Sequence, residues 1–168
     1  KKLDRIILLS QEDEQTLRSF FPKSNFTFIP TGVDIQHFSF VHPDRPKSKR
    51  LIYVGHYPHY PNQDAVIYFV NKIFPRIRRK IPEVEFLIVG SSPTEKIKKI
   101  SKQPNIKLIH DVEDVGPYLR ESAIFVNSIR VSAGIKGKVL EAMATGLPVV
   151  STKAGASGID AKDGKEIL

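Results

Sequence analysis

The chain has 168 residues, of which 40% are apolar, and it carries a formal net charge of +8 and no cysteine. This length suits a domain of ordinary size. The lack of cysteine excludes disulfides, thiolate metal sites and a cysteine nucleophile, and it fits a reducing, cytoplasmic compartment. No apolar run approaches the roughly 20 residues that a membrane-spanning helix needs.

The positive charge gathers in three segments, residues 45–50, 72–80 and 96–102. Such segments are most often solvated helix faces and loops. An acidic partner or an anionic membrane surface is the alternative, so peripheral contact with the inner face of a membrane stays open. Nucleic acid is not an expected partner, because no helix-turn-helix, zinc-finger or aromatic RNA-binding signature accompanies the charge.

Short apolar runs alternate with helical patterns along the chain. Most of the runs lack polar alternation, which is typical of strands buried on both faces of a parallel sheet. The sequence therefore predicts an α/β fold with helices on both sides of that sheet. The predicted strands are Ile6–Leu9, Phe26–Ile29, Leu51–Val54, Glu85–Val89, Ile106–Ile109, Ile124–Val126 and Leu147–Val150.

Several helix boundaries can be predicted from the sequence. A short helix is expected over residues 11–21, and Asn62 is a good N-cap for the helix that follows the third strand. Pro75 lies inside that helical stretch and predicts a kink or a restart. A helix over residues 136–145 should stop at Gly146, which suits the residue after a helix C-terminus.

Residues 30–50 begin with a turn cluster and continue as a charged, proline-rich stretch with few apolar residues. This composition predicts a linker between residues 1–29 and a domain formed by residues 51–168. The chain starts without Met or an apolar signal segment, and it ends without a helix stop signal. Both ends therefore predict a piece of a longer protein.

The most informative candidate site follows the strand that ends at Val126. Its loop combines glycines with cations and leads into a helix that carries one carboxylate. Backbone amides, fixed cations and a helix dipole together favour a diphosphate, and a carboxylate can accept hydrogen bonds from sugar hydroxyls. This combination predicts a nucleotide-sugar site made by Arg130, Gly134, Lys136, Gly137, Lys138 and Glu141.

Other candidates follow neighbouring strands, because open α/β sheets bind ligands at the carboxyl ends of their strands. His56 could donate a hydrogen bond to a phosphate. His56 and His59 are not expected to hold a metal, since no carboxylate stands at a matching spacing. The candidates at these strand ends are Gly55, His56, Gly90, Ser91 and Val112.

The segment Lys138–Val150 resembles the family 4 (group 1) retaining glycosyltransferases of the GT-B fold. Further segments match along nearly the whole chain in the same order. Ile29–Asp34, with Phe38 beyond it, is similar to an interdomain element of that family, with Thr31 in place of its usual Asn. Phe86–Gly90 and Tyr118–Val126 match later strands.

The resemblance implies the C-terminal half of a two-domain GT-B enzyme. Residues 1–29 would be the tail of the acceptor domain, and residues 51–168 would be most of a Rossmann-like donor domain. The intact enzyme would transfer a hexose from a UDP- or GDP-sugar to a glycan or lipid-linked acceptor with retention, in polysaccharide biosynthesis and without a metal or other cofactor. This piece alone is expected to bind nucleotide without catalysing transfer.

Two departures from the family pattern leave alternatives open. The family usually has two glutamates eight positions apart; the second falls on Glu141, but Ala133 stands at the first. The loop after the strand Leu51–Val54 also lacks the Arg and Lys that commonly hold phosphates, so the cations near Glu141 are expected to supply that charge. A sugar-nucleotide epimerase of the same architecture and a non-catalytic nucleotide-sugar-binding module are the alternatives.

Overall fold

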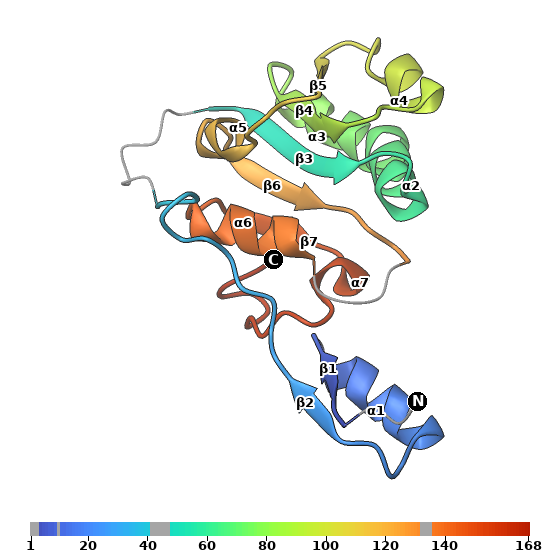
Figure 1. The fold of residues 1–168 in the computed structure, drawn as a ribbon. Helices are drawn as coiled ribbons and strands as arrows, with labels where there is room; N and C mark the ends of the chain where they lie inside the picture. Colours follow the sequence, from blue (N-terminus) through green and yellow to red (C-terminus); the bar gives the residue numbers. More distant parts are fainter. Residues whose placement is uncertain (1–3, 10, 41–47, 132–135) are drawn as a thin grey trace.

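The structure is a computed structural model that describes residues 4–9, 11–40, 48–131 and 136–168 (Figure 1). In this part of the chain the named strands form two sheets, one of two strands and one of five. All strand pairs in both sheets are parallel. The α/β class with a parallel sheet, expected from the unbroken apolar runs, is therefore confirmed.

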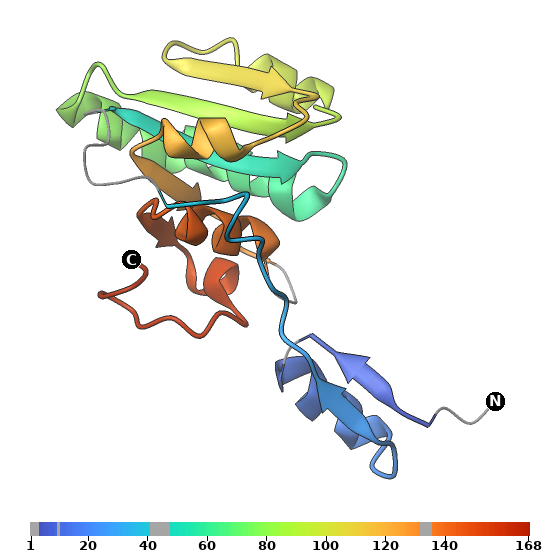
Figure 2. The same cartoon turned by 60° about the vertical axis from the view of Figure 1, so that its left-hand side comes forward.

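The smaller sheet belongs to the N-terminal unit. Strand β1 (Ile6–Leu8) is followed by helix α1 (Gln11–Phe20) and by strand β2 (Phe26–Phe28). β1 and β2 pair directly, with Ile6 opposite Phe26. Figures 1 and 2 show this unit, in blue, apart from the large sheet and joined to it by the extended chain after β2.

The larger sheet has the strand order β5-β4-β3-β6-β7. From β3 the chain adds strands outward to β5, then returns to the other side of β3 for β6 and β7. In such a sheet the crossover direction reverses between β3 and β6, and a crevice opens beside their carboxyl ends. The strands are β3 (Arg50–His56), β4 (Glu85–Ser91), β5 (Ile106–His110), β6 (Ile124–Asn127) and β7 (Val149–Ser151).

One face of this sheet is covered by α2 (Tyr60–Tyr68), the π-helical turn η1 (Phe69–Ile73), α3 (Phe74–Lys80) and α4 (Glu95–Ile100). The rings of Phe69, Phe74 and Phe86 meet there, with centroids 4.6–6.0 Å apart. Pro75 lies in the first turn of α3, where its missing N–H costs nothing. The predicted restart at Pro75 is thus confirmed.

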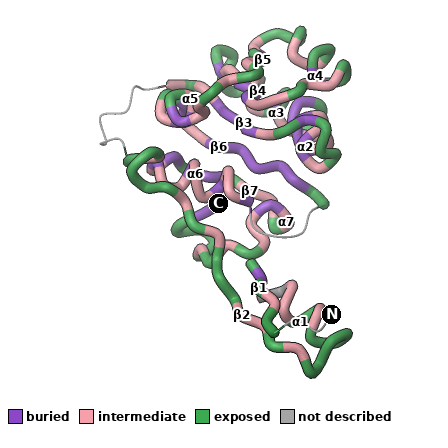
Figure 3. The backbone as a smooth tube through the Cα atoms, viewed as in Figure 1, coloured by how far each residue is buried: buried purple, intermediate pink, exposed green. Residues whose placement is uncertain are grey.

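The opposite face is covered by α5 (Gly116–Arg120) and α6 (Gly137–Ala144). Because successive strand residues point to opposite sides, Ile52 and Val54 face this second core while Leu51 and Tyr53 face the first. The sheet is therefore doubly wound, as Figures 1 and 2 show. A last short helix, α7 (Lys153–Ala156), follows β7. Strands β3 and β4 are buried along most of their length (Figure 3).

One predicted helix boundary is confirmed, and another is wrong. Gly146 has φ +69° just after α6, as expected of a residue that ends a helix in the left-handed region. Asn62 is not an N-cap, because α2 begins at Tyr60 and His59 occupies the N-cap position. Pro61 moves the helix start forward, since proline suits the first turn. This leaves the Asn62 side chain buried inside the fold.

Residues 30–40 run along the second core as an exposed segment (Figure 3). The Asp34 carboxylate accepts hydrogen bonds from the backbone N–H groups of Gln36 and His37, which closes a short turn. Phe38 then packs against the second core, and the His37 ring lies 3.0 Å from the Asp114 carboxylate. This part of the predicted linker is thus attached to the large sheet's helices, while residues 41–47 lie outside the described part.

Candidate functional site

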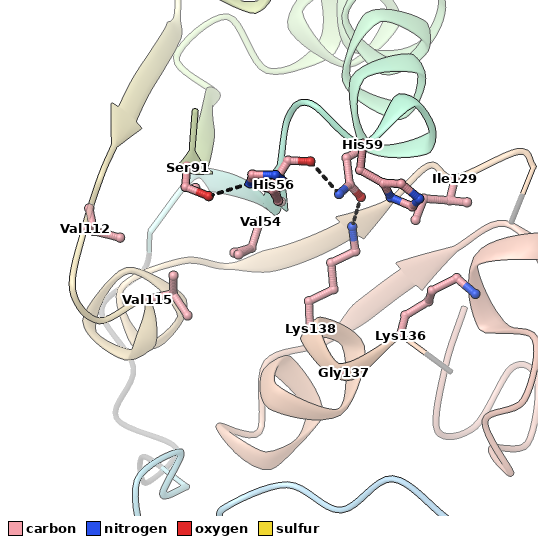
Figure 4. A pocket seen from close by; sticks show the side chains of 13 residues that line it. Val54, His56, His59, Ser91, Val112, Val115, Ile129, Lys136, Gly137 and Lys138 are labelled. Carbon is pink, nitrogen blue, oxygen red and sulfur yellow. Dashed lines mark hydrogen bonds between the residues drawn. The ribbon is translucent and has the colours of Figure 1, made fainter. Parts of the chain in front are cut away.

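A pocket of about 410 Å³ opens at the carboxyl ends of β3 and β4, beside the start of α6 (Figure 4). Ile129, just after β6, also lines the pocket, which therefore lies at the crevice expected between β3 and β6, where the crossover direction reverses. Most of the residues predicted from sequence as site residues lie together in its wall, although they come from segments far apart in the chain. They are Gly55, His56, Gly90, Ser91, Val112, Lys136, Gly137 and Lys138.

The floor of the pocket depends on Gly90. This residue has φ +147°, and a Cβ there would lie 1.8 Å from the carbonyl oxygen of Gly55. Only glycine therefore lets the ends of β3 and β4 approach this closely. The same two strand ends place His56 Nδ1 2.9 Å from Ser91 Oγ, so these two polar groups face the pocket as a pair.

Lys138 reaches across the pocket from the first turn of α6 (Figure 4). Its Nζ donates hydrogen bonds to Tyr53 Oη at 2.7 Å and to Asn62 Oδ1 at 2.6 Å. Tyr53 Oη in turn donates to Asn62 Oδ1 at 2.8 Å, and Asn62 Nδ2 donates to the His56 carbonyl at 2.9 Å. The ammonium also lies 4.2 Å from the centre of the Tyr53 ring. A lysine, a tyrosine and an asparagine from three elements thus form one connected network.

Burial, aided by the nearby positive charge of Lys136 and opposed by Glu141, lowers the pKa of Lys138 to about 7. Burial also raises the pKa of Tyr53 well above its usual value, so its hydroxyl stays protonated. Lys136 is itself buried and occupies the N-cap position of α6. The two lysines therefore place positive charge in the pocket wall at a helix N-terminus.

Arg130 is not part of the pocket wall. Its guanidinium forms a two-point ion pair with the Asp64 carboxylate, at 3.0 Å for Nε and 2.6 Å for the terminal nitrogen. It also stacks over the Tyr68 ring at 4.5 Å. Because Asp64 compensates its charge, Arg130 has less positive charge to offer a phosphate than the sequence suggests. Its predicted role as a phosphate ligand remains a prediction, without support from this arrangement.

Glu141 lies one turn beyond Gly137 on α6 and is half buried. Burial raises the pKa of its carboxyl group, and the charge of Lys138 lowers it. A Cβ placed on Gly137 would lie 3.9 Å from Glu141 Oε1, so the carboxylate stays close to the start of the helix. Gly134 and Ala133 lie outside the described residues, and the predicted role of Gly134 stays a prediction.

The chain that follows β5 gives the pocket an apolar side. Val112 and Val115 lie across the pocket from Lys136 (Figure 4). The exposed pair His110 and Asp111, 2.8 Å apart, comes just before them. Asp111 has φ +57°, a turn conformation that aspartate tolerates better than most side chains. This turn redirects the chain from β5 toward the valines.

Tyr53 and Asn62 are the polar side chains of this network that sequence reasoning missed as site residues. The apolar run around Tyr53 indicated only a buried strand, and Asn62 fitted the pattern of a helix cap. The one available signal was Pro61, which shifts the helix start and so frees Asn62 from capping.

In the described part of the chain, no three His, Asp or Glu side chains gather into a possible metal site. No helix there is both long and apolar enough to cross a bilayer.

Residues 48–168 match the family model described as glycosyl transferases group 1. The chain belongs to this family. Among relatives of this glycosyltransferase chain is an uncharacterized 44.6 kDa protein in the cps region of Klebsiella pneumoniae, 24% identical over 98% of the chain and 43% of the relative. The chain therefore spans less than half the length of that relative.

Solved structures share the fold of this group 1 chain. TarM matches with a TM-score of 0.77 and 19% identity over 96% of the chain and 32% of TarM. The pneumococcal O-GlcNAc transferase GtfA, solved in complex with UDP and GlcNAc, matches with a TM-score of 0.68 and 21% identity over 90% of the chain and 30% of GtfA. The chain thus has the Rossmann-like fold found in GT-B glycosyltransferases.

Proposed function

We propose that this chain is the donor-binding, C-terminal half of a GT-B glycosyltransferase that transfers a hexose from a nucleotide diphosphate sugar. The observation that carries the proposal is the position of Lys138 in the pocket wall at the start of α6. Its ammonium donates hydrogen bonds to two uncharged oxygens, those of Tyr53 and Asn62. A diphosphate would bring the negative charge that this position favours.

The chemistry follows from charge neutralisation of the leaving group. A nucleoside diphosphate leaves readily once fixed positive charge stabilises the negative charge that develops on it. Lys136, Lys138 and the N-terminus of α6 supply this charge, so we expect no metal ion or other cofactor to be needed. Glu141 would accept hydrogen bonds from the ribose hydroxyls. The anomeric configuration of the sugar would be retained if the leaving phosphate guides the acceptor. The acceptor would then attack the same face of the sugar from which the phosphate leaves.

We favour a UDP-sugar as the donor, with a GDP-sugar as the alternative. GtfA, which shares the fold, was solved with UDP, and Val112 and Val115 offer an apolar surface suited to a base. The acceptor would be a glycan or a lipid-linked sugar in polysaccharide biosynthesis, bound by an N-terminal domain of which residues 1–29 are the end. The cps-region relative is consistent with that setting.

We place the protein in the cytoplasm, in peripheral contact with the inner face of the membrane. Exposed basic residues of α3 and α4, among them Arg79, Lys80 and Lys99, could meet anionic lipids there. A non-catalytic nucleotide-sugar-binding module is the second candidate, because Ala133 stands where the family usually has a glutamate. Sugar transfer by the full-length protein distinguishes the two.

Isothermal titration of the chain at pH 6.5 with UDP-glucose and GDP-mannose tests the proposal. We expect one of them to bind, and Lys138→Met to weaken that binding about tenfold to a hundredfold, because a charge-assisted hydrogen bond contributes roughly 1.5–3 kcal/mol. Lys80→Met removes an exposed lysine of α3 and should leave the affinity unchanged. Equal affinity of the Lys138→Met variant and the parent chain would contradict the proposal.

A further inference from the structure

Ring stacking, a hydrogen bond to the backbone and close packing hold Tyr53 and Asn62 of this network in place. The Tyr53 ring stacks on Phe125 with 13° between the planes, and Tyr53 is fully buried. Asn62 is tied to the His56 carbonyl through its Nδ2. A Cβ on Gly55 would lie 3.1 Å from both the Asn62 Cγ and the Tyr53 Cε1, so little space remains for either group to move. The two oxygens that meet Lys138 therefore have fixed positions.

Helix α2 treats two cations differently. The Asp64 carboxylate of this helix forms an ion pair with Arg130, so the two opposite charges neutralise each other. Two residues earlier on the same helix, the amide oxygen of Asn62 accepts a hydrogen bond from Lys138. The amide carries no net charge. An amide orients an ammonium through a hydrogen bond but does not neutralise it. The charge of Arg130 is thus neutralised by a carboxylate partner on α2, whereas the partner of Lys138 on the same helix leaves its charge available to an anion.

We propose that Tyr53 and Asn62 are positioning residues that hold the Lys138 ammonium against the diphosphate of the donor without neutralising it. The inference rests on the proposed function and adds to it how the charge of Lys138 is directed toward the diphosphate. Tyr53 and Asn62 need not touch the donor, because they act through Lys138. The neutrality of Asn62 is the essential feature, since a carboxylate in its place would pair with the lysine and repel the diphosphate.

The charged surroundings of Lys138 make this proposal testable by pH. Lys136 and Glu141 lie on its own helix, with opposite effects on it. His56, the last residue of β3, and His59, from the loop after it, line the same pocket. With a pKa of about 7, Lys138 loses its charge as the pH rises through neutrality. Affinity for a nucleotide sugar should therefore fall as the pH increases from 6 to 9, because the diphosphate of the sugar stays ionised throughout.

The experiment is a titration of UDP-glucose into the chain between pH 6 and 9. We expect Asn62→Asp to weaken binding at least tenfold at pH 6.5 and to move the midpoint of the pH profile upward, since a carboxylate stabilises the ammonium. Tyr53→Phe should also weaken binding, but should move the midpoint downward, because the ammonium loses a hydrogen-bond acceptor. A purely structural role would lower the affinity at every pH without moving either midpoint.

Two controls isolate the effect. Gln63→Glu adds the same negative charge one residue farther along α2, outside the pocket wall, and should leave the midpoint unchanged. Lys138→Met should abolish the pH step, which separates Lys138 from the two histidines.

Thermal unfolding shows which variants are folded, and if Asn62→Asp does not fold, the nearly isosteric Tyr53→Phe decides. Unmoved midpoints in folded variants overturn this inference alone. Failure of the unaltered chain to bind either UDP-glucose or GDP-mannose at any pH overturns the proposed function, and this inference with it.

Discussion

We expect Lys138 to serve the proposed site at a cost to the stability of the fold. Its side chain is partly buried, and the hydrogen bonds from its ammonium to Tyr53 and Asn62 are made to neutral oxygens. Burying a charge without an opposite charge is unfavourable, and the lowered pKa of Lys138 expresses that cost. Binding sites commonly keep such strained groups because they gain favourable partners only when the ligand arrives.

The pH dependence of this cost can be predicted with its sign. The pKa of Lys138 is about 7 in the folded chain and about 10.4 in an unfolded one. Between these values the unfolded state binds the proton more strongly, so the free energy of unfolding should rise as the pH increases from 7 toward 10. Below pH 7 both states are protonated and the full penalty applies.

We therefore expect Lys138→Met to stabilise the chain by about 1 kcal/mol at pH 7. The gain should shrink toward pH 10, where the native lysine is neutral in the folded state. Urea unfolding at pH 7 and pH 9.5 measures both values. A loss of stability in the methionine variant at pH 7 would show that the hydrogen bonds of Lys138 outweigh its desolvation.

At the scale of elements, the ends of β3 and β4 set the shape of the pocket floor. These strands run in direct register from Arg50 opposite Glu85 to His56 opposite Ser91. The register brings Gly55 beside Gly90, and the close approach of the two glycines depends on the missing side chain of Gly90. The strands therefore remain paired up to the residues that line the pocket.

We expect Gly90→Ala to lower the free energy of unfolding by about 2 kcal/mol or more, because the new Cβ would meet backbone and the φ of +147° is strained for alanine. Gly32→Ala is the matched control, since a Cβ at Gly32 meets nothing within 4 Å. Chemical denaturation of both variants measures the difference. Similar stability of the two variants would mean that the ends of β3 and β4 can separate at little cost.

At the scale of the whole molecule, residues 30–40 connect the small N-terminal sheet with the large one. The segment is attached to the second core through Phe38, and His37 pairs with Asp114 just before α5. The Phe40 ring also lies over Gly146, where a Cβ would come within 2.3 Å of it. These contacts fix the path of the chain along the helices near the pocket.

We predict that Phe38→Ala releases this segment, because the side chain supplies its apolar contact with the core. The free energy of unfolding should fall by about 1–2 kcal/mol, and limited proteolysis should cut within residues 31–40 sooner than in the parent chain. Ile35→Ala is the control, since Ile35 is 72% exposed in the same segment. Equal cleavage rates for the two variants would show that Phe38 does not anchor the segment.

The fold was largely predictable from the sequence because its signals are local. Unbroken apolar runs such as Phe86–Val89 identify strands buried on both faces, and residues such as Pro75 and Gly146 mark where helices restart or stop. The grouping of Gly55, Gly90 and Lys138 around one pocket was also within reach, since parallel strands bring their carboxyl ends to one edge.

By itself, the sequence determined the parallel α/β architecture, the position of its strands and the edge where a ligand would bind. Only the tertiary structure decided which charge remains available there. Arg130 and Asp64 are 66 residues apart, and Lys138 and Asn62 are 76 apart. Which of these partners meet depends on strand order and helix placement. Periodicity reports how a side chain faces its own element, but it carries no information on which distant side chain lies opposite.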